Sequence, residues 1–288
     1  MMKFTLASRH PDGGTRERYF YEWSIIHVAL MITGPHAPQA FRRYVQHFAV
    51  SGVSGEELLY PFSQEDWESF AEHWVEKYED IAHSLHAPDY VQRMQPHRFG
   101  SQKFITGLSN FEVVYEKRGF RSGGIKLIHF LKSRPEVSQE EFNAWFCQQR
   151  GRRILDSVCN AGLVEKYVRN VPVSLDPATF RGTLFELGSI GLYAGMEELW
   201  CETVEGAIRL RRDQQICDQI RANERDFVDR EGSISMIVKE RVVWDFVTPG
   251  EMTPQPAILN PTSLEALIDQ QGYSDFDKTE ETRRTAPS

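Results

Sequence analysis

The chain repeats itself at a domain-sized interval, and this repeat limits the folds open to it. Residues 43–47 (RYVQH) return as residues 166–170 (KYVRN), 123 positions later. Phe20 and Trp23 return as Phe142 and Trp145, 122 positions later, and the run 111–115 returns as 234–238. Solenoid repeats are much shorter, about 20–50 residues. We therefore predict a duplicated domain: a first repeat over 1–120, a second over 121–247 and an extended tail over 248–288.

Composition narrows the class of protein. The 288 residues carry a net charge of −8, and Lys and Arg are scattered along the chain, which argues against a nucleic-acid partner or an anionic membrane surface. No apolar run approaches the ~20 residues of a membrane span. The first residues lack an apolar signal core. We expect a cytoplasmic protein whose four cysteines are free thiols.

Each half reads as strand, helix, strand, strand, helix, strand. In the first half we predict strands at 3–8, 43–50, 56–60 and 111–117, and helices at 15–33 and 64–86. In the second half we predict strands at 126–131, 166–171, 197–201 and 233–246, a helix that starts at a Ser138 capping box, and a helix over 204–223. The spacing places extra material around the second helix of the first half, and between the two middle strands of the second half.

This order predicts an α+β fold. A β-α-β-β-α-β unit forms a four-stranded antiparallel sheet with both helices on one face, which makes it ferredoxin-like. The other face is apolar and must be buried. Two such repeats packed sheet to sheet would close an α/β barrel inside one chain, so either a monomer or a homodimer is compatible with the sequence.

Three segments in order resemble the EthD family of the dimeric α/β-barrel superfamily. They are 3–8 (KFTLAS), 22–30 (EWSIIHVAL) and 43–47 (RYVQH), and the second half adds 224–229 (ERDFVD). The resemblance implies the barrel fold with a pocket. Relatives in this superfamily include cyclases, isomerases, dehydratases, cofactor-free monooxygenases and haem enzymes, so it does not choose a reaction.

Histidines supply the candidate catalytic groups. His27 falls on the apolar stripe of the first helix, one turn after Trp23, where a partly desolvated imidazole could act as a general acid or base. His47 and Tyr44 share a strand, three residues apart, so their side chains should leave opposite faces. The second half has Gln149 and Asn170 at the positions of His27 and His47, which assigns histidine chemistry to the first half. A core histidine satisfied by a backbone carbonyl is the competing interpretation.

Aromatic side chains supply the candidate binding surface. We assign Trp23, Phe48, Trp67 and Trp74 to substrate binding, with the caution that aromatic residues at spacings of three and four are more often a helix core face. His83 and His86, three residues apart, could share a metal, but no further ligand has a matching spacing, so a solvated surface is favoured and no metal is assigned.

The favoured hypothesis is a cofactor-independent enzyme that performs acid/base chemistry as a lyase, dehydratase, cyclase or isomerase on a hydrophobic, aromatic or polyketide-like small molecule. One alternative is an oxygen-using monooxygenase or haem enzyme of the same superfamily. The other is a non-catalytic small-molecule binder. The substrate and the direction of the reaction stay open.

Overall fold

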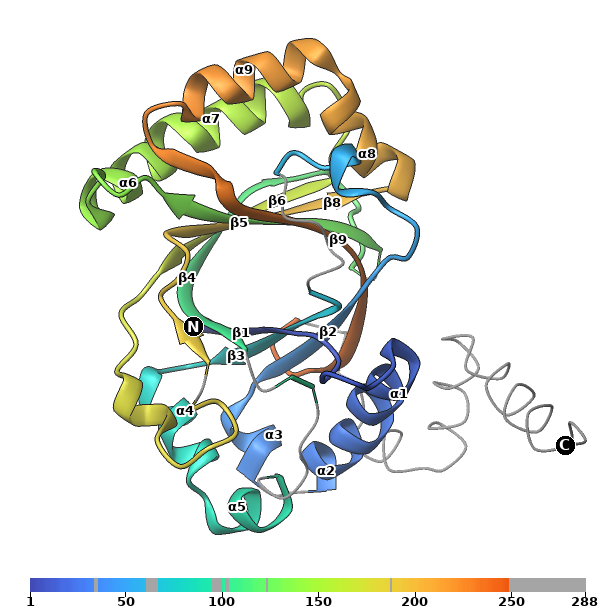
Figure 1. The fold of residues 1–288 in the computed structure, drawn as a ribbon, viewed down its shortest axis with the longest axis vertical. Coiled ribbons are helices and arrows are strands. Elements are labelled where there is room, and N and C mark those ends of the chain that lie inside the picture. The colour runs from blue at the N-terminus through green and yellow to red at the C-terminus, as the bar shows by residue number, and fades with distance from the viewer. Residues whose placement is uncertain are drawn as a thin grey trace, which may run out of the picture.

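A computed structural model shows an antiparallel β-barrel flanked by helices on two opposite sides (Figure 1). The structure describes residues 1–33, 36–60, 67–94, 100–101, 104–122, 124–186 and 188–248. Within these residues, eight strands follow the order β1-β3-β2-β9-β5-β8-β6-β4, and pairing of β4 with β1 closes the ring. Closure leaves no exposed barrel edge. The predicted tail lies, after residue 248, outside the described residues.

The first half contributes four strands and a group of short helices. The strands are β1 (Met2–Ser8), β2 (Arg43–Ala49), β3 (Ser69–Val75) and β4 (Ile105–Glu116). The helices are α1 (Arg16–Tyr21), the π-helix η1 (Glu22–His27), α2 (Val28–Thr33), α3 (His36–Ala40), the 3-10 helix η2 (Gly55–Glu57), α4 (Tyr78–Leu85) and α5 (Pro88–Met94).

The second half repeats the strand order of the first, as β9-β5-β8-β6 against β4-β1-β3-β2. Its strands are β5 (Ile125–Ser133), β6 (Lys166–Pro172), β8 (Gly195–Cys201) and β9 (Val228–Asp245), with a two-residue strand β7 (Ser189–Ile190) paired parallel to β4. Its helices are α6 (Gln139–Trp145), η3 (Phe146–Arg150), α7 (Gly151–Ile154), η4 (Leu155–Cys159), η5 (Pro177–Phe180), α8 (Val204–Arg212) and α9 (Gln214–Glu224).

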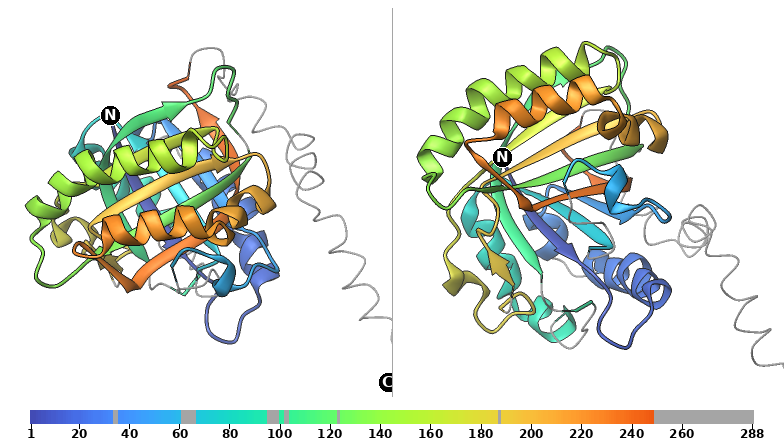
Figure 2. Two further views of the ribbon diagram at one scale, coloured as in Figure 1. Left: turned by 90° about the horizontal axis from the view of Figure 1, so that it is seen from above. Right: turned by 45° about the horizontal axis from the view of Figure 1, so that its top comes forward.

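The helices form two separate layers outside the barrel. Helices α6 to α9 cover the strands of the second half, and α1 to α5 lie on the opposite side against the first half (Figures 1 and 2). Successive strand residues point alternately to the helices and to the barrel interior. On β1, Phe4 joins the helix-side core, whereas Ala7 joins an interior core with Phe70 and Phe130. Among the described residues, no helix has the length and apolar composition that a membrane crossing requires.

Several predicted elements are found where the sequence placed them. Thr15 and Ser138 are helix N-caps, and the strands predicted at 3–8, 43–50, 126–131, 166–171 and 197–201 match observed strands to within a few residues. The strands predicted at 111–117 and 233–246 coincide with the later parts of β4 and β9, which begin at residues 105 and 228. The helix predicted over 204–223 is instead two helices. Asp213 has an extended backbone there, and its carboxylate accepts the amide hydrogen of Ile216 to start α9.

The third strand of the first half was predicted wrongly. Residues 56–60 do not form a strand, because Ser54 and Glu57 make a capping box that starts a 3-10 helix. The strand is β3, inside the region predicted as a helix over 64–86, of which residues 64–66 lie outside the described residues. Both faces of β3 are buried, so its sequence SFAEHWV lacks the alternation that identifies a half-exposed strand.

The registers relate the two halves residue by residue. Lys3 pairs with Trp74 on β3, and Lys126 pairs with Trp200 on β8, so positions 3 and 126 are equivalent at the predicted shift of 123. On the last strands, Lys3 pairs with Ser109 and Lys126 with Val238. The two partners, Ser109 and Val238, are 129 residues apart in the sequence. The predicted match of 111–115 with 234–238 was therefore wrong by six positions.

Each half sends a connection into the core of the other half. The segment 50–68, which joins β2 to β3, places Val53, Leu58, Leu59 and Tyr60 in the core beneath the helices of the second half. The segment 173–194, which joins β6 to β8, places Leu175, Phe180 and Phe185 in the core of the first half. The predicted exchange of insertions was wrong, because the connections between the middle strands, 50–68 and 173–194, have similar lengths once β3 is the third strand. The two helical cores are completed reciprocally.

Tyr60 connects the segment 50–68 to the second half through several hydrogen bonds. It is fully buried; its hydroxyl donates to Glu224 Oε2 at 2.9 Å and accepts from Arg150 Nη2 at 3.1 Å. Its backbone N–H donates to Ser235 Oγ at 3.2 Å. Arg150 also forms a two-point contact with Glu197, which closes a buried charged network under the second helical layer.

We predict that Tyr60→Phe lowers the free energy of unfolding by about 1–3 kcal/mol, because it leaves buried polar partners without the hydroxyl. Urea denaturation followed by circular dichroism measures this. Tyr21→Phe, at a side chain that is 38% exposed, is the matched control and should change little. Equal midpoints for the two variants would contradict a stabilising role for the Tyr60 hydroxyl.

Candidate functional site

Charged side chains lie in the middle of the barrel interior. Lys126 on β5 is fully buried, and its Nζ lies 2.7 Å from Glu72 Oε1, 2.7 Å from Glu198 Oε2 and 2.9 Å from Glu240 Oε2. Lys3, its equivalent on β1, contacts Glu198 and Glu72. Two lysines thus face three glutamates, which gives this buried cluster a net charge of −1 when His47 is neutral.

His47 belongs to this cluster. Its Nδ1 donates to the carbonyl oxygen of Phe70 at 3.1 Å. Its Nε2 lies 2.8 Å from Lys126 Nζ, which can only donate. The same Nε2 lies 3.4 Å from Glu240 Oε2 and 3.5 Å from Glu72 Oε1.

Proximity of opposite charges sets the pKa values in the cluster. Burial alone would raise the pKa of Glu240, but the Lys126 ammonium outweighs burial and holds that pKa far below its usual value. The pKa of Glu72 is lowered in the same way, by Lys126 and then by Lys3. Burial would lower the pKa of Lys126, yet Glu198 and Glu240 raise it well above its usual value. Glu72, Glu240 and Lys126 are therefore charged throughout the neutral range.

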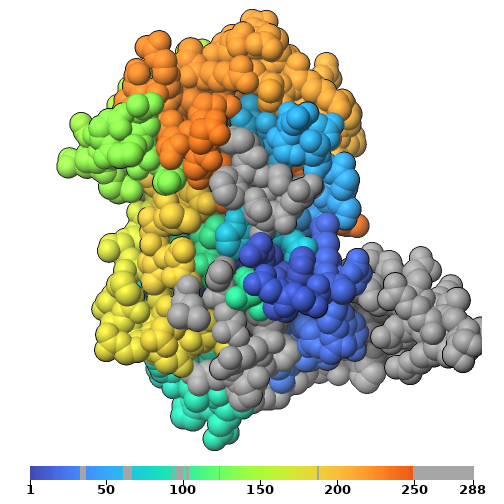
Figure 3. All heavy atoms as spheres, viewed as in Figure 1, coloured from blue at the N-terminus to red at the C-terminus, as the bar shows by residue number. Residues whose placement is uncertain are grey.

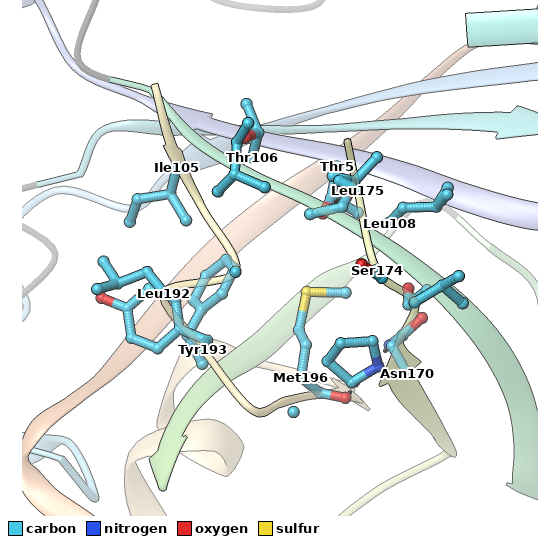
Figure 4. A pocket seen from close by; sticks show the side chains of 18 of the residues that line it. Thr5, Ile105, Thr106, Leu108, Asn170, Ser174, Leu175, Leu192, Tyr193 and Met196 are labelled. Atoms are coloured by element: carbon cyan, nitrogen blue, oxygen red, sulfur yellow. Dashed lines mark hydrogen bonds between the residues drawn. The ribbon is translucent and has the colours of Figure 1, made fainter. Parts of the chain in front are cut away.

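A pocket of about 410 Å³ lies at the end of the barrel next to this cluster. Its walls come from β4, the inner faces of β1 and β5, the end of β6, the start of β8 and the segment 173–194 (Figure 4). The space-filling view shows that segment as a continuous yellow surface between the two helical layers (Figure 3). Most lining side chains are apolar, among them Ile105, Leu108, Phe130, Leu175, Ile190 and Met196.

The polar part of the pocket lining is small and uncharged. It consists of Thr5, Thr106, Ser109, Gln139, Asn170, Ser174 and Tyr193. Among the described lining residues there is no His, Cys, Lys, Arg, Asp or Glu. Asn170 connects the pocket to the charged cluster, because its Nδ2 donates to Glu198 Oε1 at 2.8 Å. The pocket can hold an apolar molecule, but its described walls offer no group that titrates near neutral pH.

The candidate catalytic residues of the sequence analysis lie away from this pocket. His47 is inside the charged cluster, whereas Tyr44 points the other way, into the helix-side core, as the three-residue spacing predicts. Tyr44 stacks on His73 at 4.5 Å between ring centroids, and its hydroxyl accepts from Gln46. His27 is buried at the end of η1. The structure brings Trp23 and Gln46 together, through the Trp23 carbonyl, but gathers no catalytic set among the described residues.

The candidate binding aromatics are also dispersed. Trp23 and Phe48 pack against each other at 5.0 Å on the helix side of β2. Trp74 lies on β3, beneath the Arg43 guanidinium, and donates through Nε1 to Glu72. Trp67 packs against the interior apolar core. Since none of the four lines the described pocket, their assignment to substrate binding stays a prediction.

His73, His86, Cys159 and Cys201 have structural surroundings. His86 donates through Nε2 to the Thr179 carbonyl, and burial lowers the pKa of His73 to about 3. Burial raises the pKa of Cys159 and of Cys201 to about 12, which suits inert thiols. Within the described part of the chain, no three His, Cys, Asp or Glu side chains are arranged to hold a metal ion.

Sequence reasoning missed the charged cluster and the pocket. Lys3, Glu72, Lys126, Glu198 and Glu240 all lie on strands whose other residues are largely apolar, where single charges usually face solvent. Only the repeat carried a signal, because Lys3 and Lys126 are equivalent at the shift of 123. A charged residue at the same strand position in both halves would be unusual if that position faced solvent.

Comparisons with known proteins give distant structural likeness only. No family model matches the chain, and no curated protein matches it, so the resemblance to the EthD family stays a prediction. A candidate monooxygenase of Fusobacterium nucleatum is similar over 84% of this chain and 92% of its own, with 7% identity and a TM-score of 0.47. Chlorite dismutase of Candidatus Nitrospira defluvii covers 91% and 95%, with 12% identity and a TM-score of 0.43. A haem-binding protein of Thermus thermophilus covers 83% and 90%, with 9% identity and a TM-score of 0.39.

The favoured functional hypothesis is corrected by these results. A cofactor-independent lyase, dehydratase, cyclase or isomerase was expected, whereas the similar structures are named as monooxygenases, chlorite dismutases and a haem-binding protein. The geometry agrees with the correction, because no histidine or carboxylate lines the described pocket. The alternatives that remain are an oxygen-using monooxygenase or haem enzyme, and a non-catalytic small-molecule binder.

Haem, which the name of the Thermus thermophilus protein mentions, does not fit the described pocket. Haem iron is usually held by His or Cys, or by Met or Tyr in particular classes. The lining offers Met196 and Tyr193, but among its described residues it has neither a His or Cys ligand nor an Arg or Lys to pair with propionates. The Tyr193 ring packs on Phe130 at 5.3 Å. We derive no chemistry through haem for this site.

We predict that Lys126→Met destabilises the fold by about 3–5 kcal/mol, because the substitution leaves buried carboxylates without their ammonium partner. Urea denaturation of Lys117→Met gives the control: that lysine is 60% exposed and pairs with Glu165 at the surface. A Lys126→Met protein as stable as the control would show that the cluster contributes nothing.

We predict that the free energy of unfolding falls steadily as the pH drops below about 4.5, the ordinary carboxyl pKa. Glu72 and Glu240 have lowered pKa values in the folded protein, so their contribution is present above the unfolded value and is lost as they protonate. Urea midpoints from neutral pH down to about pH 3 test this, since the carboxyl groups titrate across that range. Unchanged midpoints below the ordinary carboxyl pKa would contradict it, and Lys126→Met should show a shallower decline.

Proposed function

We propose that this barrel binds a hydrophobic small molecule in the pocket at its end. The carrying observation is the pocket itself: about 410 Å³ with apolar walls and a few neutral polar groups. Ligand sites are generally concave, about 300–1,000 Å³, and mostly apolar with a small number of placed polar groups. The volume suits a molecule of one or two fused rings better than a peptide or nucleotide.

The uncharged lining supports an uncharged ligand. A carboxylate or phosphate in this pocket would lack a cation among the described lining residues. The Lys3 and Lys126 ammonium groups lie behind Asn170 and are already paired with glutamates. The pocket therefore selects for an apolar, neutral compound.

A second candidate function is a cofactor-free monooxygenase that uses the same pocket. The observation that favours it is a mostly apolar lining without a described acid or base, in which a bound substrate would have to supply its own reactivity towards oxygen. Exclusion of water also protects reactive intermediates from side reactions. Binding without turnover and binding with oxygen uptake separate the two candidates.

We also propose that the barrel consists of two ferredoxin-like repeats, 1–120 and 121–247, that arose by duplication. The equal strand orders of the two halves support this, as do the equivalent pairs Lys3 with Trp74 and Lys126 with Trp200. The extended tail over 248–288 stays a prediction.

Native mass spectrometry of the purified protein is the first test. A mass excess over the chain that disappears on denaturation identifies a retained ligand, and visible absorbance reports haem. A haem mass with a Soret band would overturn the assignment. An oxygen electrode with the recovered ligand then distinguishes the monooxygenase from the binder.

We predict that Ile190→Trp weakens binding of naphthalene at least about tenfold, because the larger ring would occupy the space that the ligand needs. Ile190 lies on β7 at the pocket wall and is half-buried, so the barrel can tolerate the change. Ile190→Leu, which keeps the volume, is the control. Calorimetric titration measures both, and equal affinities would place the ligand elsewhere.

A further inference from the structure

The amide of Asn170 has a fixed orientation at the inner wall of the pocket. Its Nδ2 donates to Glu198 Oε1 at 2.8 Å and to the Met196 carbonyl at 3.4 Å. Both partners are acceptors only, so the NH₂ end must face them. The carbonyl end, Oδ1, is therefore directed away from Glu198. Figure 4 shows Asn170 beside Met196 and Ser174 on the wall of the pocket.

Asn170 Oδ1 is an acceptor without a hydrogen-bond partner. The side chain is fully buried, and Oδ1 is the one buried unpartnered side-chain atom among the described lining residues. Other lining groups are engaged: Thr5 Oγ1 donates to the Gly107 carbonyl at 3.2 Å, and Gln139 Nε2 donates to the Ala194 carbonyl at 3.0 Å. A buried acceptor without a donor carries a free-energy penalty, so we expect a donor to bind at this position.

The first half shows that this acceptor is specific to the second half. His47 is the equivalent of Asn170, because the two residues pair at matching positions in their strands. His47 uses both ring nitrogens, with Phe70 and Lys126. The exchange of histidine for asparagine leaves an amide oxygen on a pocket-lining residue that no described protein group hydrogen-bonds.

We propose that Asn170 Oδ1 accepts a hydrogen bond from the ligand, and that the ligand is an apolar molecule with one uncharged hydroxyl or N–H donor. This inference rests on the proposed binding function and names the ligand class. Asn170 determines specificity by orienting the donor towards the charged cluster, while Ile105, Phe130 and Met196 contact the apolar body. An anion is disfavoured, because the Glu198 carboxylate lies directly behind the amide.

Three probes of similar shape test the inference. 1-Naphthol has a donor, 1-methoxynaphthalene has only an acceptor, and naphthalene has neither. Calorimetric titration gives the preference for 1-naphthol over 1-methoxynaphthalene in the wild type and in Asn170→Leu. The preference should fall by about 3–10-fold in the variant, the typical net worth of one hydrogen bond. The Met196→Leu protein, with an altered apolar wall, should keep it.

Outcomes separate this inference from the proposed function. If all three probes bind and the preference is equal in wild type and Asn170→Leu, the pocket stands and the role of Asn170 is overturned. If none binds the wild type, the binding function fails and the inference fails with it. Absorbance of bound 1-naphthol in the wild type gives a check that needs no variant. A red shift relative to the free probe in hydrocarbon supports donation to an acceptor, and an unshifted spectrum overturns it.

Discussion

The buried ammonium of Lys126 is the interaction on which the barrel interior depends. It lies within hydrogen-bonding distance of three carboxylates and one imidazole, and these side chains come from four different strands. Removal of a charged ammonium from water has a large desolvation free energy, so its partners must be held in place by the surrounding strands. Closure of the barrel therefore brings the charges together. In turn, the charges favour the one strand register in which they are paired.

The cluster also determines where a ligand can lie. Charged residues lie in the middle of the barrel interior, and apolar residues such as Phe70 and Ile128 lie beside them. The open volume is displaced to the end of the barrel, where β6 stops and β7 returns beside β4. Asn170 lies at the boundary: it lines the pocket, its Nδ2 donates to Glu198 in the ionic cluster, and its Oδ1 has no partner among the described residues.

The sequence predicted the barrel through the repeat and through strand alternation, because both are local or periodic signals. It mispredicted β3, whose two buried faces remove the alternation, and it placed 56–60 in a strand although a Ser54 to Glu57 capping box was readable. The site was less predictable. Glu198 and Lys126 look like ordinary surface charges until closure of the ring buries them, and Asn170 becomes notable only when its neighbours show that one amide end is unpartnered. Such properties are set by contacts between distant segments.

The segment 173–194 contributes both to the core of the first half and to the wall of the pocket. Its residues Leu175, Phe180 and Phe185 complete the core of the first half, while Leu175, Ile190 and Tyr193 line the pocket. Occupancy of the pocket and the docking of the two halves are therefore thermodynamically linked. A ligand that binds only the docked state raises the stability of the whole barrel with its concentration. Thermal shift would thus report pocket occupancy directly, even for a compound that leaves no spectroscopic trace.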